Sequence, residues 1–494
     1  MKKTFTLFAL FWSAVTLSAQ ALYTEKQYGW RIEKDLEYGV AVNYSNIPTA
    51  LILDLYKPVG DNNPHRPLLV LVHGGSWLGG CKDDPNSGIV AIAKEMAQRG
   101  YAVASVNYRL GWHKDDYVPA AIPPDINPLG SCLYAADSSE LIRAIYRGQQ
   151  DVKGAIRWLK ARASMDSTSA NAVLVGGESA GAFIAMAVGF LDRPEEKPFS
   201  CDLLPTAPVP ASNVQNCYSL NCIAQTITPT GAALERPDLG PVGGTLNLNG
   251  QSDNVVGVAS FFGGVPYEAA PKDWLQGPDT PAVYFYHQTC DGIVPFGAGI
   301  PMFAISNYCN LGFTPWHLNY PITYGNGSIA ALFEASPNPP IFTTDFEQCP
   351  PFNPDIAFFE CLRYGQNGSY HFIQNPPLRA QKMADFFCPI VTAALGTTGC
   401  TVNSVEPATT EWSGAKVSPN PFGQMLSVFI AEALEGEASI ALTDISGKTV
   451  WSAVRILNAG ENVLFEQNHL PAGFYALQIR SKAGVGIWKV VRRQ

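Results

Sequence analysis

The sequence predicts two folded parts, a large α/β domain followed by a small all-β domain. Three observations indicate this division. A valine-rich apolar run, 172–175, precedes a glycine-containing turn and a stretch of helix formers, 182–190, as expected for a strand, a sharp turn and a helix. Two more apolar runs, 68–72 and 282–286, read as buried strands that end in turns. After residue 413 the chain changes to short alternating stretches separated by turn residues, which is typical of a small antiparallel sandwich.

The composition of the 494 residues is that of a globular protein with a large core. Apolar residues make up 47% of the chain and charged residues 15%, which argues against a disordered chain. The formal net charge is −9, and no basic cluster stands out. Electrostatics therefore give no support for nucleic-acid binding.

The N-terminus has the order of a secretory signal peptide. Two lysines follow Met1, then comes an apolar stretch, 5–17, and then small residues around Ala19. A buried N-terminal helix is the alternative. We expect residues 1–20 to be removed and the mature protein to be exported, because the apolar stretch is too short to serve as a transmembrane segment.

Export changes the interpretation of the cysteines, because disulfides persist in oxidising compartments. Their spacings contain neither C-x-x-C nor the Cys/His pairing of zinc sites, so we expect no metal site. The chain has eleven cysteines, an odd number, so at least one thiol stays unpaired or pairs with another chain. The eleven positions are Cys81, Cys132, Cys201, Cys217, Cys222, Cys290, Cys309, Cys349, Cys361, Cys388 and Cys400.

The domain boundary is expected where the cysteines stop. Residues 397–412, rich in Gly, Thr, Ser and Pro, read as a linker between a catalytic domain at 21–396 and an all-β domain at 413–494. Two long segments of the first domain, 191–252 and 301–365, are rich in proline and carry cysteines. We expect them to be ordered, lid-like insertions that narrow a site.

Ser179 is the candidate nucleophile. It stands at the centre of Gly177-Glu178-Ser179-Ala180-Gly181, a G-x-S-x-G pattern between the predicted strand and helix. Such a serine adopts a strained backbone that neighbouring chains approach closely, which requires small residues around it. An ordinary serine in a turn is the alternative. We expect the side chain of Glu178 to point away from Ser179 into a polar network.

A serine nucleophile also needs donors for the oxyanion, and a glycine pair after a strand can supply them. The strand 68–72 ends in His73-Gly74-Gly75, where the backbone can turn its amides toward a carbonyl oxygen. The amide of Ala180, at the start of a helix, is the other expected donor. His73 would orient the loop. A tight turn without a binding role is the alternative interpretation of the glycines.

The acid is expected after the strand 282–286, where Asp291 occupies a polar turn. A side chain just beyond the carboxyl end of a strand points into the crevice where sites form in open α/β sheets. A turn-capping aspartate is the alternative. The rival acids are Asp345, Glu347, Asp355 and Glu360.

The base is expected to follow the acid in the chain, as it does when the serine lies on a strand-turn-helix elbow. His371 meets this condition in a glycine-containing loop before a helical stretch, 378–395. His317, in a proline-flanked segment, is the less favoured alternative. His287 lies within an apolar strand, which favours a role in the core or at the strand end. The remaining histidines precede Ser179 or follow the domain boundary: His65, His73, His113 and His469.

These motifs together resemble the α/β-hydrolase fold, and within it the carboxylesterase and hormone-sensitive-lipase-like serine esterases. The resemblance rests on "HGGSW" at 73–77, "NYRLG" at 107–111, "GGESAGA" at 176–182, "CDGIVPF" at 290–296, and His371. It implies a doubly wound, mostly parallel sheet and a carboxylic ester hydrolase without a cofactor. The site residues it implies are Ser179, Asp291 and His371, with oxyanion donors at Gly74, Gly75 and Ala180. A serine peptidase and a non-catalytic adhesion protein remain alternatives on the same fold.

The C-terminal part, 413–494, resembles the sorting domain of the type IX secretion pathway of Bacteroidetes. The matching stretches are "VSPNPF" at 417–422, "LTDISGKTV" at 442–450, "LPAGFYALQI" at 470–479 and "WKVVRRQ" at 488–494. The resemblance implies the outer-membrane secretion machinery as partner, and a secreted or cell-surface location reached through the periplasm. An accessory sugar-binding sandwich is the alternative.

Overall fold

The computed structural model describes residues 22–116, 133–209, 233–266, 268, 280–309 and 319–397, and residues 415–492 with short gaps at 420–421, 423–424, 432–434, 445–448, 467–469, 472 and 482–483. The expected signal peptide, nearly all of the expected linker, and His317 lie outside these residues. Contacts divide the chain into two compact units, Met1–Cys400 and Thr401–Gln494. Among the described residues, no helix has the length and apolar character needed to cross a membrane.

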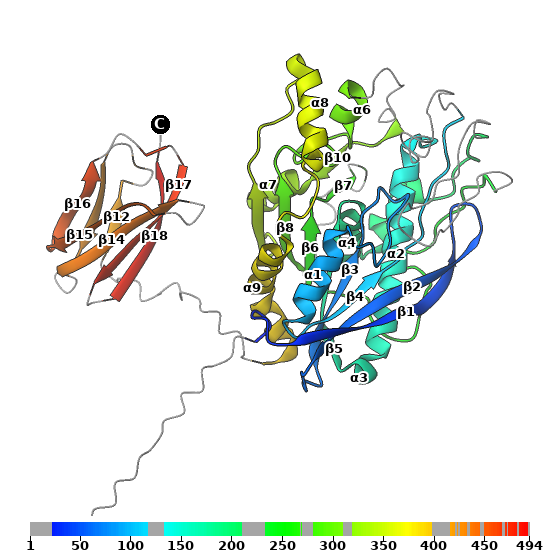
Figure 1. Ribbon diagram of the computed structural model, residues 1–494, viewed down its shortest axis with the longest axis horizontal. Coiled ribbons are helices and arrows are strands. Elements are labelled where there is room, and N and C mark those ends of the chain that lie inside the picture. Colours follow the sequence, from blue (N-terminus) through cyan, green and yellow to red (C-terminus); the bar gives the residue numbers. More distant parts are fainter. Residues whose placement is uncertain are drawn as a thin grey trace, which may run out of the picture. The chain divides into compact units, whose positions relative to one another are not determined.

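The first unit is built on an eight-stranded sheet (Figure 1). The last six strands in spatial order are parallel, and the first two form an antiparallel edge. This architecture confirms the expected mostly parallel α/β sheet. In spatial order the strands are β1 (Gly29–Val42), β2 (Pro48–Val59), β4 (Ala102–Val106), β3 (Arg66–Val72), β5 (Thr168–Glu178), β6 (Gly257–Phe261), β8 (Ala282–Gln288) and β11 (Phe342–Glu347).

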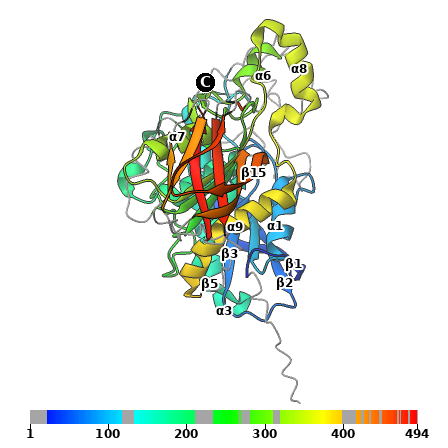
Figure 2. The ribbon, with the colours of Figure 1, turned by 90° about the vertical axis from the view of Figure 1, so that its left-hand side faces the viewer.

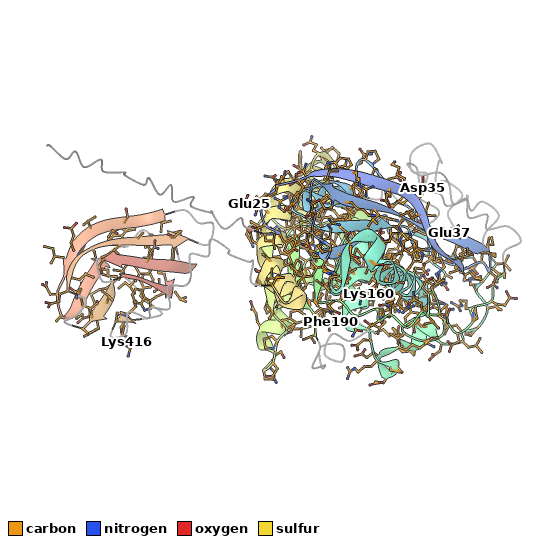
Figure 3. The ribbon with its side chains drawn as sticks, turned by 90° about the horizontal axis from the view of Figure 1, so that it is seen from below. Glu25, Asp35, Glu37, Lys160, Phe190 and Lys416 are labelled. Atoms are coloured by element: carbon orange, nitrogen blue, oxygen red, sulfur yellow. A yellow bond between two sulfur atoms is a disulfide. The ribbon has the colours of Figure 1, made fainter. Side chains whose placement is uncertain are left out.

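Helices cover both faces of this sheet, because its central strands are apolar on both sides. Every residue of β3, β6 and β8 is buried. Helices α1 (Gly88–Ala97) and α9 (Pro376–Leu395) contribute to one core. Helices α2 (Ser139–Ala161) and α4 (Ala180–Phe190) contribute to the other. Figure 3 marks Lys160 near the end of α2 and Phe190 at the end of α4. A short helix, α3 (Ala163–Asp166), leads from α2 into β5.

The segment 301–365, expected to be a lid-like insertion, contains part of the main sheet. Its β11 pairs in parallel with β8 and forms the edge of the sheet. The prediction missed this strand because its side chains are only partly buried, so it lacks an apolar signal. The rest of the segment carries α6 (Phe303–Tyr308), β10 (Thr323–Gly325), α7 (Asn326–Ala335) and α8 (Ala357–Gln366). Strand β10 joins β7 (Gly264–Pro266) and β9 (Ala298–Gly299) in a small separate sheet.

Disulfides hold this segment in place. Cys309 at the end of α6 bonds to Cys361 in α8, and Figure 2 shows these two helices together at one end of the unit. The described part of the other long segment, 191–252, packs along α2. There the guanidinium of Arg143 donates to the carbonyls of Ser200 and Pro237.

The second unit is all-β, as the sequence predicts. A three-stranded sheet contains β12 (Lys416–Ser418), β13 (Met425–Ile430) and β16 (Gly460–Glu466). A four-stranded sheet contains β15 (Thr449–Leu457), β14 (Gly436–Asp444), β17 (Gly473–Ser481) and β18 (Gly484–Arg492). Every neighbouring pair in both sheets is antiparallel. The alternating stretches that the sequence predicts as strands, 426–430, 438–444, 462–465, 473–479 and 486–491, lie within β13, β14, β16, β17 and β18. The strands β12 and β15 were not predicted.

Candidate active site

Ser179 lies on a sharp turn between β5 and α4. Its backbone angles are φ 53° and ψ −123°, a strained conformation for a residue with a side chain. The surrounding backbone leaves no room for larger residues. A Cβ atom on Gly177 would lie 2.2 Å from the carbonyl oxygen of Gly181, and one on Gly181 would lie 2.2 Å from that of Val72. The two glycines therefore allow the elbow that the sequence pattern predicts.

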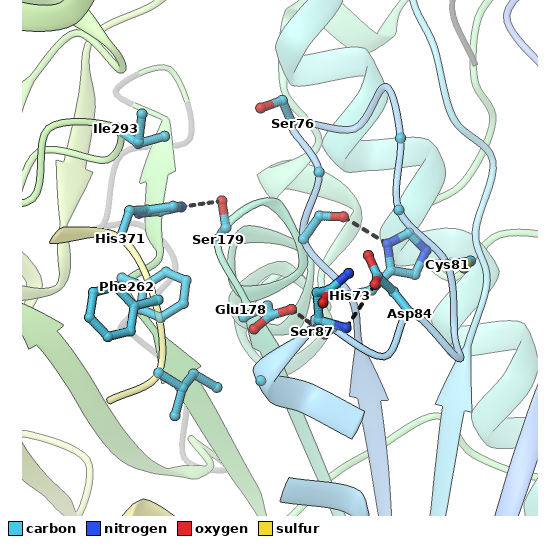
Figure 4. A pocket seen from close by; sticks show the side chains of 18 of the residues that line it. His73, Ser76, Cys81, Asp84, Ser87, Glu178, Ser179, Phe262, Ile293 and His371 are labelled. Carbon is cyan, nitrogen blue, oxygen red and sulfur yellow. Dashed lines mark hydrogen bonds between the residues drawn. The ribbon is translucent and has the colours of Figure 1, made fainter. Parts of the chain in front are cut away.

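His371 reaches this serine from the other side of the site. It follows the short 3₁₀ helix Gly368–Tyr370 and precedes α9. Its Nε2 atom lies 2.7 Å from Oγ of Ser179 (Figure 4). The imidazole packs against the ring of Phe262, with 4.5 Å between the ring centroids. The serine hydroxyl and the imidazole are thus within hydrogen-bonding distance, although the two residues are 192 positions apart in the sequence.

Asp291 completes the chain of hydrogen bonds. Its Oδ2 atom lies 2.7 Å from Nδ1 of His371, while Oδ1 accepts hydrogen bonds from the amides of Ile293 and Val294 at 2.8 and 3.0 Å. The side chain is fully buried. Burial by itself raises the pKa of a carboxyl group, but His371 and the hydrogen bonds from His287 and His371 outweigh it and lower the pKa of Asp291.

His287 is a second histidine on the same carboxylate. Its Nε2 atom lies 3.1 Å from Oδ2 of Asp291 and 3.2 Å from the carbonyl oxygen of Val294. Because both neighbours are acceptors, Nε2 carries the proton. The sequence analysis favoured a role for His287 in the core or at the strand end and missed this contact. Its spacing of four residues before Asp291, across the end of β8, was the available signal.

A disulfide anchors the loop that follows β8 and carries Asp291, which is called the acid loop below. Cys290, next to Asp291, bonds to Cys349, just after the neighbouring strand β11. The hydroxyl of Tyr364 donates to the carbonyl of Cys290 at 2.7 Å. The loop that carries the acid is therefore tied both to the edge of the sheet and to α8.

The rival acids take part in other interactions. Asp345 and Glu347 form ion pairs with Arg379 on α9. Glu360 forms an ion pair with Arg363 within α8. These interactions stabilise the edge of the sheet and helix α8. Asp355 lies in the 3₁₀ turn Pro354–Ile356, where its amide donates to Asn353.

The loop after β3 borders the serine, as expected. Its Gly75 has a φ of 109°, a conformation that favours glycine. His73 lies inside the loop, where its Nδ1 donates to the Gly74 carbonyl at 2.7 Å and its ring stacks on Tyr108. Burial lowers the pKa of His73 to about 4, so the ring is neutral at pH 7. These contacts order the loop.

Gly74 lies beside Glu178, since a Cβ atom on Gly74 would be 3.4 Å from Cγ of Glu178. Burial raises the pKa of Glu178, although the hydroxyl of Ser87 and the backbone of Gly74 act in the opposite direction. The assignment of the Gly74 amide to an oxyanion stays a prediction. Ser76, with a φ of 53°, lines the same pocket and was missed.

The amide of Ala180 lies at the start of α4, directly after Ser179. The first amides of a helix have no partner within the helix. The role of this amide as an oxyanion donor stays a prediction.

Ser179, His371, Phe262 and the loop 73–76 line one cavity of about 730 Å³. Figure 4 shows His371 and Phe262 on one side of Ser179, with His73, Asp84, Ser87 and Glu178 on the other. The arrangement can transfer a proton from the serine hydroxyl to an imidazole held by a buried carboxylate. Among the described residues, no group of His, Cys, Asp and Glu side chains has the geometry of a metal site.

Ser179, His371 and the buried Asp291 come together beside a mostly parallel sheet, an arrangement that resembles that of serine hydrolases with the α/β-hydrolase fold. Two family models match this chain. The BD-FAE model, an esterase-like domain, matches residues 53–129. The secretion system C-terminal sorting domain matches residues 416–493. The chain thus has an esterase-like domain followed by a type IX sorting domain, which indicates secretion or a cell-surface location.

A curated relative resembles a short part of the chain. Carboxylesterase patB of Penicillium expansum is 38% identical over 72 residues, which are 12% of this chain and 13% of the relative. The match therefore spans about an eighth of that carboxylesterase.

Several solved esterases resemble the first unit at low identity. A truncated carbohydrate esterase from gut microbiota is 14% identical, with a TM-score of 0.38, and the match covers 74% of this chain and 98% of that one. Thermogutta terrifontis esterase 2 is 15% identical, with a TM-score of 0.35 and coverages of 69% and 93%. Esterase B of Lactobacillus rhamnosis is 14% identical, with a TM-score of 0.38 and coverages of 76% and 92%.

Proposed function

We propose that this protein hydrolyses carboxylic esters through an acyl-enzyme on Ser179. The observation that carries the proposal is the unbroken series of 2.7 Å contacts from Ser179 Oγ to His371 Nε2 and from His371 Nδ1 to Asp291 Oδ2. Such a series lets a weakly acidic hydroxyl act as a nucleophile at neutral pH. The esterase-like family match supports an ester as the substrate.

In the acylation half, Oγ of Ser179 bonds to the ester carbonyl carbon while Nε2 of His371 takes the hydroxyl proton. The buried charge of Asp291 stabilises the imidazolium that forms. The amides of Gly74, Gly75 and Ala180 donate to the oxyanion of the tetrahedral intermediate. Its collapse breaks the bond to the alcohol oxygen, and His371 returns the proton to the departing alcohol.

In the deacylation half, water replaces the alcohol. His371 removes a proton from the water as its oxygen attacks the acyl carbon, and the proton then passes to Oγ of Ser179 as the acid departs. The proposal requires no metal or cofactor.

The decisive experiment replaces Ser179. Ser179→Ala should remain folded and lose ethyl acetate hydrolysis by several orders of magnitude, because the nucleophile is gone. Ser169→Ala, at the opposite end of the same strand, is the matched control and should keep its turnover. Near-normal turnover by Ser179→Ala would contradict the proposal. Turnover of an amide in place of an ester would favour a serine peptidase, and absence of any turnover would favour an adhesion protein.

We also propose how the protein reaches its location. A signal peptide at residues 1–20 would direct it to the periplasm, and the domain at 413–494 would then present it to the outer-membrane secretion machinery. The sorting-domain match supports the second step. The disulfides are those of a protein that folds in an oxidising compartment.

A further inference from the structure

A second cavity lies behind the acid loop. Its volume is about 360 Å³, within the ~300–1,000 Å³ typical of ligand pockets. The stretch 289–304 forms one side and residues near α8 form the other. Four aromatic side chains contribute to its walls: Phe296, Phe303, Phe352 and Tyr364.

The second cavity adjoins the cavity that contains Ser179. Ile293 and Met302 line both cavities, so these two residues form the boundary between them. The Met302 amide donates to the carbonyl of Ile293 at 2.6 Å, which holds the pair together. Figure 4 shows Ile293 next to His371. A substituent of an ester bound at Ser179 would therefore contact Ile293 and Met302 before it could enter the second cavity.

The walls favour an uncharged, apolar occupant. Asp291 is the acidic residue among the described lining residues, and its carboxylate is fully buried and hydrogen-bonded on both oxygens. The Tyr364 hydroxyl is engaged with the carbonyl of Cys290, so its ring is the part available to a ligand. Aromatic side chains offer a large apolar surface at low entropic cost. Phe303 is 43% exposed, which places it at the rim where the cavity meets solvent.

The frame of the cavity is rigid, whereas its boundary is adaptable. The bond between Cys290 and Cys349 and the bond between Cys309 and Cys361 tie the walls together on both sides. Met302 has an unbranched, polarisable side chain that fits irregular shapes. The pocket is therefore preformed, and the side chain of Met302 can change conformation to admit a part of the ligand that crosses the boundary.

We propose that this second cavity is a subsite for an apolar arm of the substrate ester, with Ile293 and Met302 as the boundary that the arm crosses. This rests on the proposed ester hydrolysis at Ser179. Either the acyl chain or the alcohol chain of an ester can supply such an arm. The two isomers ethyl hexanoate and hexyl acetate distinguish the sources, with ethyl acetate as the short reference.

The test places a large side chain on the wall of the second cavity, where it would occupy the proposed subsite. Ala304 lies on α6 and lines the cavity, whereas Asn307 lies on the same helix, is exposed and does not line it. Ala304→Trp should lower kcat/KM for one or both of the C8 esters by about tenfold or more, because the arm loses its apolar surroundings. Its kcat/KM for ethyl acetate should stay within about twofold. Asn307→Trp should leave all three values unchanged.

A binding measurement separates the subsite from the catalytic proposal. Ser179→Ala should bind the favoured C8 ester in calorimetry, and Ser179→Ala with Ala304→Trp should bind it about tenfold more weakly. Equal losses of kcat/KM for all three esters, or no loss at all, would overturn the subsite and leave ester hydrolysis intact. Selective binding in a protein that hydrolyses no ester would retain the subsite and overturn the catalytic proposal.

Discussion

The Oδ2 atom of Asp291 lies 2.7 Å from Nδ1 of His371, although the two residues are 80 positions apart in the sequence. The amides of Ile293 and Val294 hold the other carboxylate oxygen, so the carboxylate has little freedom to rotate. The acid loop thereby sets the orientation of the imidazole. That orientation determines where Nε2 meets Ser179.

The first prediction concerns this contact. Asp291→Asn should lower kcat by roughly 10⁴-fold with little change in KM, because the amide cannot hold the same tautomer of the imidazole. His371→Ala should lose most activity as well. Steady-state kinetics on ethyl acetate provide the measurement, with the exposed His65→Ala as control. His317→Ala should cost little; an inactive His317→Ala beside an active His371→Ala would contradict the assignment.

The second prediction concerns His287 as a positioning residue. His287→Phe keeps a ring in the buried site but removes one N–H donor from Asp291, which should lower kcat about tenfold. Without the N–H donor of His287, the negative charge of Asp291 should stabilise the imidazolium of His371 more strongly. The acidic limb of the kcat/KM profile should then move to higher pH.

The matched control for this prediction keeps the donor. His287→Gln retains an N–H group near the carboxylate and should restore most of the activity and the original pH profile. If His287→Phe only lowered the melting temperature and left the pH profile in place, His287 would have a structural role alone.

The third prediction uses the pKa of Glu178, which burial raises above its ordinary value. A carboxyl whose folded-state pKa is raised binds its proton more tightly in the folded protein, so its contribution favours folding at acid pH and is lost as pH rises through the folded pKa. Glu178→Gln removes this titration while keeping an acceptor for Ser87. The melting temperature of the variant relative to wild type should therefore increase from pH 4 to pH 7. A constant difference across this range would contradict the raised pKa.

The fourth prediction compares the two described disulfides. Replacing both Cys290 and Cys349 by serine should destabilise the protein by ~2–4 kcal/mol and also lower kcat, because Asp291 adjoins the bond. The pair Cys309 and Cys361 closes a loop of similar length away from the acid and is the control. Its removal should cost similar stability but leave ethyl acetate turnover near normal. Equal kcat values in the two variants would show that the bond beside Asp291 has no specific role in turnover.

The fifth prediction concerns the C-terminal unit. Truncation after residue 405 should give an enzyme with nearly unchanged turnover of small esters, since Ser179, Asp291 and His371 all belong to the first unit. In the native host the truncated protein should remain in the periplasm. Cell fractionation tests this, with the full-length chain as control. Truncated enzyme at the cell surface or in the medium at the full-length level would refute the sorting role.

The predicted strands were correct where the pattern was strong. The runs 68–72 and 282–286 lie within β3 and β8, which are buried on both faces. The antiparallel edge strand β1 was missed, because most of its residues are exposed or half-buried and its pattern is mixed. An apolar run reports burial, whereas an edge strand is determined by its pairing partner.

The sequence by itself determined the local features around Ser179. Gly177 and Gly181 allow a strained turn between a strand and a helix, and this depends on backbone contacts within a few residues and on small side chains. The order of Ser179, Asp291 and His371 along the chain likewise narrowed the candidates to a few. The tertiary structure alone decided that His371 meets the serine, that His287 shares the carboxylate of Asp291, and how the cysteines of the two described disulfides pair. These contacts join residues tens to hundreds of positions apart, so they depend on strand order and loop closure, which no local pattern of residues encodes.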